Sequence, residues 1–133
     1  MTASLSAQDQ ITIRTAAYGA VSLLSAAGIA GSAHKIGTDA SLALTAATGT
    51  VGHIVADAKG LKLKGKSTAE LADQVFPAIT ESVRILEAHD PAEAENFRSI
   101  IKVVIDAADR AHKGEPSPVM ADMVRKIEDA LHA

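Results

Sequence analysis

The chain has 133 residues, of which 47% are hydrophobic and 22% charged, and this composition is typical of a folded globular protein. It contains no cysteine, so disulfides, thiolate zinc sites and cysteine nucleophiles are excluded. The net charge of −3 divides into +3 for residues 1–66 and −6 for residues 67–133, and neither value is typical of a nucleic-acid-binding protein. With one Tyr, two Phe and no Trp, the core must be aliphatic, which favours helices.

A first helix is predicted over residues 6–28. Ser6 is a suitable N-cap with Asp9 in the first turn, and Gly28 supplies a stop. Thr15 to Ala33 is a run of 19 residues without Asp, Glu, Lys, Arg or His. Because its apolar residues point in all directions around the helix, we expect this helix to be the buried, central one.

A second helix is predicted over residues 38–58, beginning at Thr38 or Asp39. Both helices carry small residues at the same spacing, 26 positions apart; in a stretch this rich in small residues, chance similarity is favoured over duplication. The two sets are Thr15, Gly19, Ser22 and Ala26, and Ser41, Thr45, Thr48 and Gly52. Small side chains at this spacing let two helices approach closely, so Thr15–Ala56 is predicted to form a packed hairpin in which the two sets meet. Gly19→Leu is then expected to destabilise the protein by about 1–3 kcal/mol.

Residues 59–66 form a basic loop with four lysines, Lys59, Lys62, Lys64 and Lys66. One interpretation is an anion or phosphate contact. The other, which we favour, is a solvated loop whose two leucines pack against the bundle. No phosphate-loop motif accompanies the lysines.

Three amphipathic helices are predicted over residues 67–88, 91–112 and 118–131. Ser67 and Glu70 form a capping box, and Asp90 caps the next helix ahead of Pro91. Pro77 lies inside the first of the three and predicts a kink or local unwinding. The chain is therefore predicted to be an all-α, single-domain bundle of about five helices over residues 1–133, in which these three cover the hairpin.

The uncharged run approaches the roughly 20 residues that span a bilayer. It is rich in Gly, Ser, Thr and Ala, which contribute little to membrane insertion, so we expect a buried soluble hairpin rather than one in a membrane. No basic leader precedes the apolar run, as a signal peptide requires. We predict a cytoplasmic protein.

No set of residues indicates catalysis or metal binding. The five histidines form no pair at zinc-site spacing, and the Asp-x-x-His of residues 109–112 has no second copy. No Ser lies in a Gly-x-Ser-x-Gly context. We therefore predict no catalytic residues, no metal and no cofactor, and an enzyme is the least favoured class.

Tyr18, His53 and Asp57 are the candidate ligand-binding residues. Tyr18 lies in an apolar helix, where a buried hydroxyl needs a partner, and a backbone or Ser/Thr oxygen is favoured. His53 has Asp57 four residues later on the same helical face. His53 is either a pH-sensitive or ligand-contacting group in a pocket or, the favoured interpretation, a half-exposed histidine at a helix end paired with Asp57.

Two function hypotheses remain. The first is a non-enzymatic interaction or scaffold module that self-associates, with a homodimer favoured, because the first two helices offer more apolar surface than three helices cover. The alternative is a helical bundle that binds a small apolar or amphipathic ligand in a pocket near Tyr18, His53 and Pro77. Nucleic acid is not expected as a partner.

Overall fold

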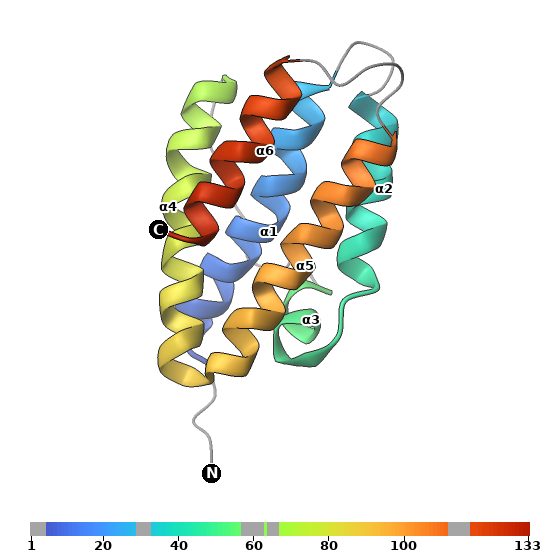
Figure 1. The fold of residues 1–133 in the computed structure, drawn as a ribbon. Coiled ribbons are helices and arrows are strands. Elements are labelled where there is room, and N and C mark those ends of the chain that lie inside the picture. Colours follow the sequence, from blue (N-terminus) through green and yellow to red (C-terminus); the bar gives the residue numbers. More distant parts are fainter. Residues whose placement is uncertain (1–4, 29–32, 57–62, 64–66, 112–117) are drawn as a thin grey trace.

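The structure is a computed structural model that describes residues 5–28, 33–56, 63, 67–111 and 118–133. Within these residues the chain is a single all-α bundle of six helices without a strand (Figure 1). The all-α fold predicted from composition is confirmed. No helix of the described chain is both long enough and apolar enough to cross a membrane.

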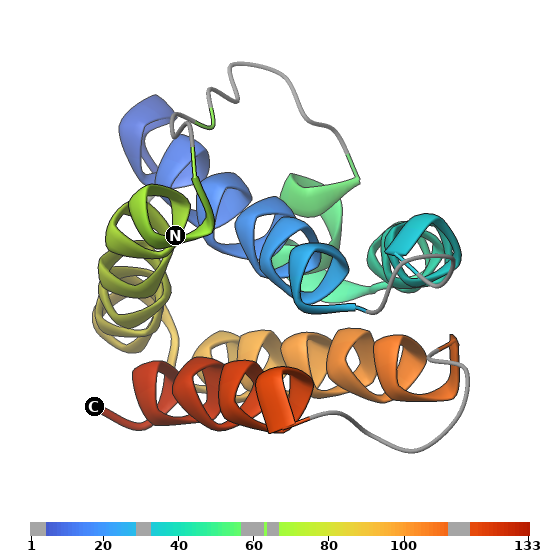
Figure 2. The ribbon, with the colours of Figure 1, turned by 90° about the horizontal axis from the view of Figure 1, so that it is seen from above.

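The first helix, α1 (Ala7–Ala27), is the centre of the bundle. The Ser6 hydroxyl accepts a hydrogen bond from the backbone N–H of Asp9 at 3.0 Å, which confirms the predicted cap. α1 packs against all five other described helices. Figure 2 shows it between α4 on one side and α2 on the other, with α5 and α6 along a third side. This position explains why its apolar residues surround the helix.

The predicted second helix is wrong, because two helices take its place: α2 (Ala33–Thr45) and α3 (Gly49–Val55). Gly49 has a φ of +78°, in the left-handed region that interrupts a right-handed helix. The chain then folds back so tightly that a Cβ on Gly52 would lie 2.5 Å from the carbonyl oxygen of Ala47. Gly52, predicted from the sequence to lie at a helix contact, therefore lies in the short helix that begins at Gly49.

α2 is amphipathic. Ile36, Ala40 and Leu44 are buried against the bundle, where α2 packs on α1 and α5. Leu42 and Thr45 are exposed on the opposite side. Part of the surface of the first two predicted helices is thus left uncovered by the rest of the described chain.

The remaining helices are α4 (Thr68–His89), α5 (Pro91–Ala111) and α6 (Pro118–Leu131). The Ser67 hydroxyl accepts from the N–H of Glu70 at 3.2 Å, so the predicted cap is confirmed. The predicted local unwinding at Pro77 is wrong, since α4 continues through it. Val75 and Ile79, on either side of Pro77, are fully buried and hold this part of α4 in the core.

The two sets of small residues do not pack as predicted. Gly19 does lie against a neighbouring helix at close range, but the atoms nearest to it belong to Val75 of α4 and not to the second set. Thr48 is exposed, outside any described helix, and Gly52 lies in α3. Two residues of each set do lie near one another, Ser22 and Ala26 on α1 and Ser41 and Thr45 on α2. These four residues line an open groove between the two helices.

Candidate functional site

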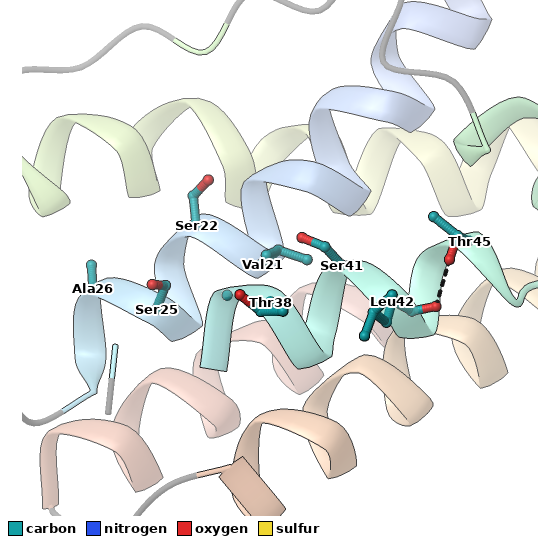
Figure 3. A pocket seen from close by; sticks show the side chains of 9 residues that line it. Val21, Ser22, Ser25, Ala26, Thr38, Ser41, Leu42 and Thr45 are labelled. Carbon is teal, nitrogen blue, oxygen red and sulfur yellow. Dashed lines mark hydrogen bonds between the residues drawn. The ribbon is translucent and has the colours of Figure 1, made fainter. Parts of the chain in front are cut away.

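A groove of about 800 Å³ lies between α1 and α2 (Figure 3). Its nine lining residues carry no formal charge, and five of them have hydroxyl groups. They are Val21, Ser22, Ser25, Ala26, Gly37, Thr38, Ser41, Leu42 and Thr45. The groove therefore combines apolar side chains with hydroxyl groups able to form hydrogen bonds.

The small side chains of α1 and α2 create this groove. At one point the helices approach closely, since a Cβ on Gly37 would lie 3.4 Å from the Ser25 hydroxyl oxygen. Beyond that point, Ser22 and Ala26 of α1 face the groove that Ser41 of α2 also lines. Because none of these side chains is large, the space between the two helices is left open.

Leu42 is the one large aliphatic side chain at this groove that is mostly exposed. Its exposed fraction is 61%, whereas Leu44, two residues further along α2, is fully buried. The Thr45 hydroxyl donates a hydrogen bond to the Leu42 carbonyl oxygen at 2.8 Å (Figure 3). This hydroxyl is satisfied within α2 and needs no partner from outside.

One ion pair lies at an end of the groove, on α2. Lys35 and Asp39 form an ion pair at 2.8 Å in the first half of α2. From Ala40 to Ala56 the sequence has no Asp, Glu, Lys or Arg. The groove lining around Leu42 is therefore uncharged, and the carboxylate of Asp39, one turn earlier on α2, is paired with Lys35.

The surfaces of α4, α5 and α6 are different, because they carry networks of ion pairs. Arg98 bridges Glu87 and Glu95, and the hydrogen bond that its guanidinium donates to Glu87 is the main cause that raises the pKa of this guanidinium. On α6, Asp122 accepts hydrogen bonds from Lys126 and Arg125. These bonds, with that from Lys126 the larger cause, lower the pKa of Asp122 below the usual value of a carboxyl group. These faces are polar and charged, unlike the α1–α2 face.

Tyr18 holds one end of α3. Its hydroxyl donates to the carbonyl oxygen of Val55 at 2.7 Å, so the predicted backbone partner is confirmed. Arg14, one turn earlier on α1, donates through Nε to the carbonyl oxygen of Ile54 at 3.0 Å. A cationic and a phenolic donor thus cap carbonyl groups at the C-terminal end of α3, where the helix dipole favours them.

The other end of α3 is held by α5. Glu93 Oε1 accepts a hydrogen bond from the N–H of Val51 at 3.0 Å, and Asn96 Nδ2 donates to the carbonyl oxygen of Thr48 at 2.9 Å. The side chain of Thr48, the residue before α3, makes no capping hydrogen bond itself. α3 is thus capped by side chains from two other helices, and this arrangement gives Tyr18 a structural role.

Pro77 lies elsewhere, at a hollow of about 870 Å³ between α4 and α6. Phe76 forms part of its apolar lining, while Asp73, Asp129 and Lys126 bring charges of both signs to it. Tyr18 lies at the α1–α3 contact, so it and Pro77 occupy different places in the fold.

His53 is exposed in the last turn of α3. The remaining candidate residues, Asp57, Lys59, Lys62, Lys64 and Lys66, lie outside the described residues. A pocket shared by Tyr18, His53 and Pro77, and an anion contact by the lysines, both stay predictions. Within the described ranges no group of three or more His, Asp or Glu side chains is placed to hold a metal ion.

Sequence reasoning missed the groove residues Ser25, Thr38 and Leu42. A signal for the last two was present, because Thr38, Leu42 and Thr45 recur at helical spacing without a charge. The fold and this site define a helical bundle with an uncharged, open groove on one face. The chain matches no protein-family model, no curated protein and no solved structure.

Proposed function

We propose that this protein is a non-enzymatic interaction module that self-associates, as a homodimer, through the face of α1 and α2 around the groove. The observation that carries the proposal is the absence of charge from this face, together with the exposure of Leu42. Self-association covers the part of the first two predicted helices that the other helices leave exposed.

The symmetry of a homodimer explains why charge matters. In a twofold interface the same residues meet each other, so a charged face brings like charges together. The groove lining has no charged side chain, and the Lys35–Asp39 ion pair lies at its end, whereas α4 and α6 present the Glu81–Arg84 and Asp122–Lys126 ion pairs. Uncharged surface with small side chains is therefore the part of this molecule best suited to contact its own copy.

Sedimentation velocity over a wide range of protein concentration tests the proposal. As the protein concentration rises, the main sedimenting species is expected to change from the 13.7 kDa monomer to a dimer of twice that mass. Because the interface is uncharged, added salt is expected to leave the dissociation constant nearly unchanged. A strict monomer up to high micromolar concentration refutes self-association, and a dimer that salt dissociates points to attraction between charged surfaces instead.

A second candidate function is binding of a small apolar or amphipathic ligand. The volume of the α1–α2 groove, about 800 Å³, falls within the usual range for ligand sites, and its hydroxyl groups offer hydrogen bonds. The other location we propose is the predicted pocket near Tyr18, His53 and Pro77, although Tyr18 lies at the α1–α3 contact and Pro77 at the α4–α6 hollow. Titration with an apolar fluorescent probe distinguishes the two, because Ser41→Phe fills only the groove and Tyr18→Phe changes only the second location.

We also propose a cytoplasmic location, which the absence of cysteine supports because the protein then has no need of an oxidising compartment. Fractionation of the native cells tests this. Recovery of the protein in a membrane or secreted fraction contradicts it.

A further inference from the structure

We propose that the hollow between α4 and α6 binds an amphipathic organic cation, a small molecule that joins an ammonium group to an apolar chain. This hollow is separate from the α1–α2 face, so the inference does not depend on self-association. It rests on the second candidate function, ligand binding, and gives that function a location and a class of ligand. Three observations carry it: the shape of the hollow, its aromatic side chain, and the excess of carboxylates around it.

One face of α4 and one face of α6 line the hollow. On α4 the lining residues recur at helical spacing, from Ala69 through Phe76 to Thr80. The two helices pack against each other (Figure 1), and the Thr80 hydroxyl ties them together by donating to the carbonyl oxygen of Ala130 at 2.8 Å. Because four of the described lining residues are alanines, a space of about 870 Å³ stays open, a volume typical of small-ligand sites.

Phe76 is the aromatic residue among the described residues that line the hollow. It packs partly against the core and still borders the open space. An aromatic ring attracts an ammonium group within about 6 Å of its centre, and its carbon surface also packs against an apolar chain. Pro77, the next residue, adds further apolar surface. Phe76 therefore suits both parts of an amphipathic cation.

The charged side chains of the hollow favour a positively charged ligand. Of its described lining residues, one carries an ammonium group and three carry carboxylates, namely Lys126 and then Asp73, Glu81 and Asp129. The Lys126 ammonium lies 2.9 Å from Asp122, which is not among the lining residues, so the one cation of the hollow is bound outside it. Residues 67–133 carry a net charge of −6, so the surrounding field also attracts cations.

Two of the three carboxylates are available to a ligand. Glu81 is paired with Arg84, but within the described ranges neither Asp73 nor Asp129 forms an ion pair. Asp129 also attracts Arg125, as the smallest of the effects that act on the pKa of that guanidinium. Both Asp73 and Asp129 are exposed, so a dissolved cation can reach them.

Other classes of small ligand fit the hollow less well. A neutral apolar molecule would take Asp73 and Asp129 out of water without giving them a partner, which is costly. An anion would meet an excess of carboxylates. A metal ion would leave Phe76 and the alanines uncovered, and no group of three or more acidic or histidine side chains in the described chain is placed to hold one. An amphipathic cation satisfies the carboxylates and the apolar lining together.

Isothermal titration calorimetry of the full chain with octyltrimethylammonium, below the concentration at which it forms micelles, tests the inference. Octyl sulfate has the same apolar chain and the opposite charge, and tetramethylammonium has the same charge without the chain. Only octyltrimethylammonium is expected to give measurable binding. If octyl sulfate binds as tightly, the charge of the hollow has no role, and if tetramethylammonium does, the apolar lining has none; either result overturns the inference.

A matched pair of double variants tests the carboxylates. Asp73→Asn with Asp129→Asn is expected to weaken the binding of octyltrimethylammonium about tenfold, since two exposed charge contacts are lost. Asp106→Asn with Asp109→Asn removes the same charge from α5, away from the hollow. In about 0.1 M salt, which screens distant charges, this control is expected to change the affinity by less than about twofold. Equal weakening by the two double variants overturns the inference, because binding then follows net charge alone.

Proton NMR of the wild-type protein gives a readout that needs no variant and so keeps the inference falsifiable if a variant misfolds. The chain has two phenylalanines, and the other one, Phe97, is fully buried in the core. Octyltrimethylammonium is expected to shift the ring resonances of Phe76 and to leave those of Phe97 in place. Unshifted Phe76 resonances overturn the inference, even where calorimetry detects binding.

Two variants that fill one space each separate this inference from ligand binding in general. Ala69→Phe fills the hollow and is expected to abolish the binding of octyltrimethylammonium, whereas Ser41→Phe fills the α1–α2 groove and is expected to leave it unchanged. If Ser41→Phe abolishes the binding and Ala69→Phe does not, ligand binding stands and the hollow is the wrong site. If neither octyl compound binds the wild-type protein, the inference and the second candidate function fail together, while self-association is unaffected.

Discussion

Replacement of Gly19 by alanine tests how closely α1 and α4 pack. A Cβ on Gly19 would lie 2.4 Å from Val75 Cγ2 and 2.9 Å from Val75 Cγ1. Carbon atoms pack best at about 3.5–4.0 Å, so the variant requires a movement of about 1 Å. Val75 is fully buried and β-branched, and its side chain has essentially one rotamer in a helix. The backbone of α4 must therefore move.

Two opposing effects set the magnitude. Overpacking of this kind costs about 1–3 kcal/mol, while alanine is a better helix former than glycine by about 1 kcal/mol. The free energy of unfolding is expected to fall by about 1 kcal/mol net. Gly19→Leu places more atoms against the same valine and is expected to cost at least as much.

Urea denaturation followed by far-ultraviolet circular dichroism measures these differences. Gly37→Ala is the matched control, because its Cβ would lie 3.4 Å from the Ser25 hydroxyl oxygen, an ordinary contact. This control is expected to stabilise the protein by about 0.5–1 kcal/mol. In a Val75→Ala background, Gly19→Ala is expected to become neutral or stabilising. If Gly19→Ala alone stabilises the protein as much as Gly37→Ala does, α1 and α4 are not in close contact and the reasoning is wrong.

Three further predictions concern α3 and α6. Gly49→Ala is expected to destabilise the protein by about 1–2 kcal/mol in the same urea assay, because the φ of +78° is strained for alanine and its Cβ would lie 2.7 Å from Asn96 Nδ2; a neutral result contradicts the turn. Tyr18→Phe is expected to cost about 1 kcal/mol, since it removes the hydrogen bond to Val55, and an unchanged midpoint would mean that water replaces this bond fully. Because the pKa of Asp122 is lowered in the folded state, its stabilising contribution is present above the pKa of the unfolded chain and is lost as the pH falls through the folded value. The difference in thermal midpoint between the wild-type protein and Asp122→Asn is therefore expected to shrink below about pH 4. A difference that grows there would mean that the pKa of Asp122 is not lowered by folding.

The helices most accessible from the sequence were those with local signals. Ser67 precedes a clean apolar stripe, and the structure places α4 one residue after it. The break between α2 and α3 had no such signal, because Gly52 suits both a helix contact and a tight turn. What decides between them is tertiary: Glu93 and Asn96, more than forty residues away, bind the start of α3.

The uncharged character of the candidate site could be predicted from the sequence, but the helix face on which the site lies could not. The uncharged run is visible in the sequence, but Leu42 and Leu44 are two residues apart in it and have opposite environments. Helical periodicity places them on different faces without saying which face is buried. The contact of α2 with α5 decides that, and it depends on residues from a distant part of the chain.

The capping of α3 has a consequence for how the molecule acquires its structure. A helix of seven residues is too short to persist alone, and its ends are completed by α1 and α5. α3 therefore forms only when those two helices are already assembled around it. The amide of Val51, which is bonded to Glu93, becomes a site-specific reporter of that assembly: its protection from hydrogen exchange measures the cohesion of the bundle and not the propensity of its own segment.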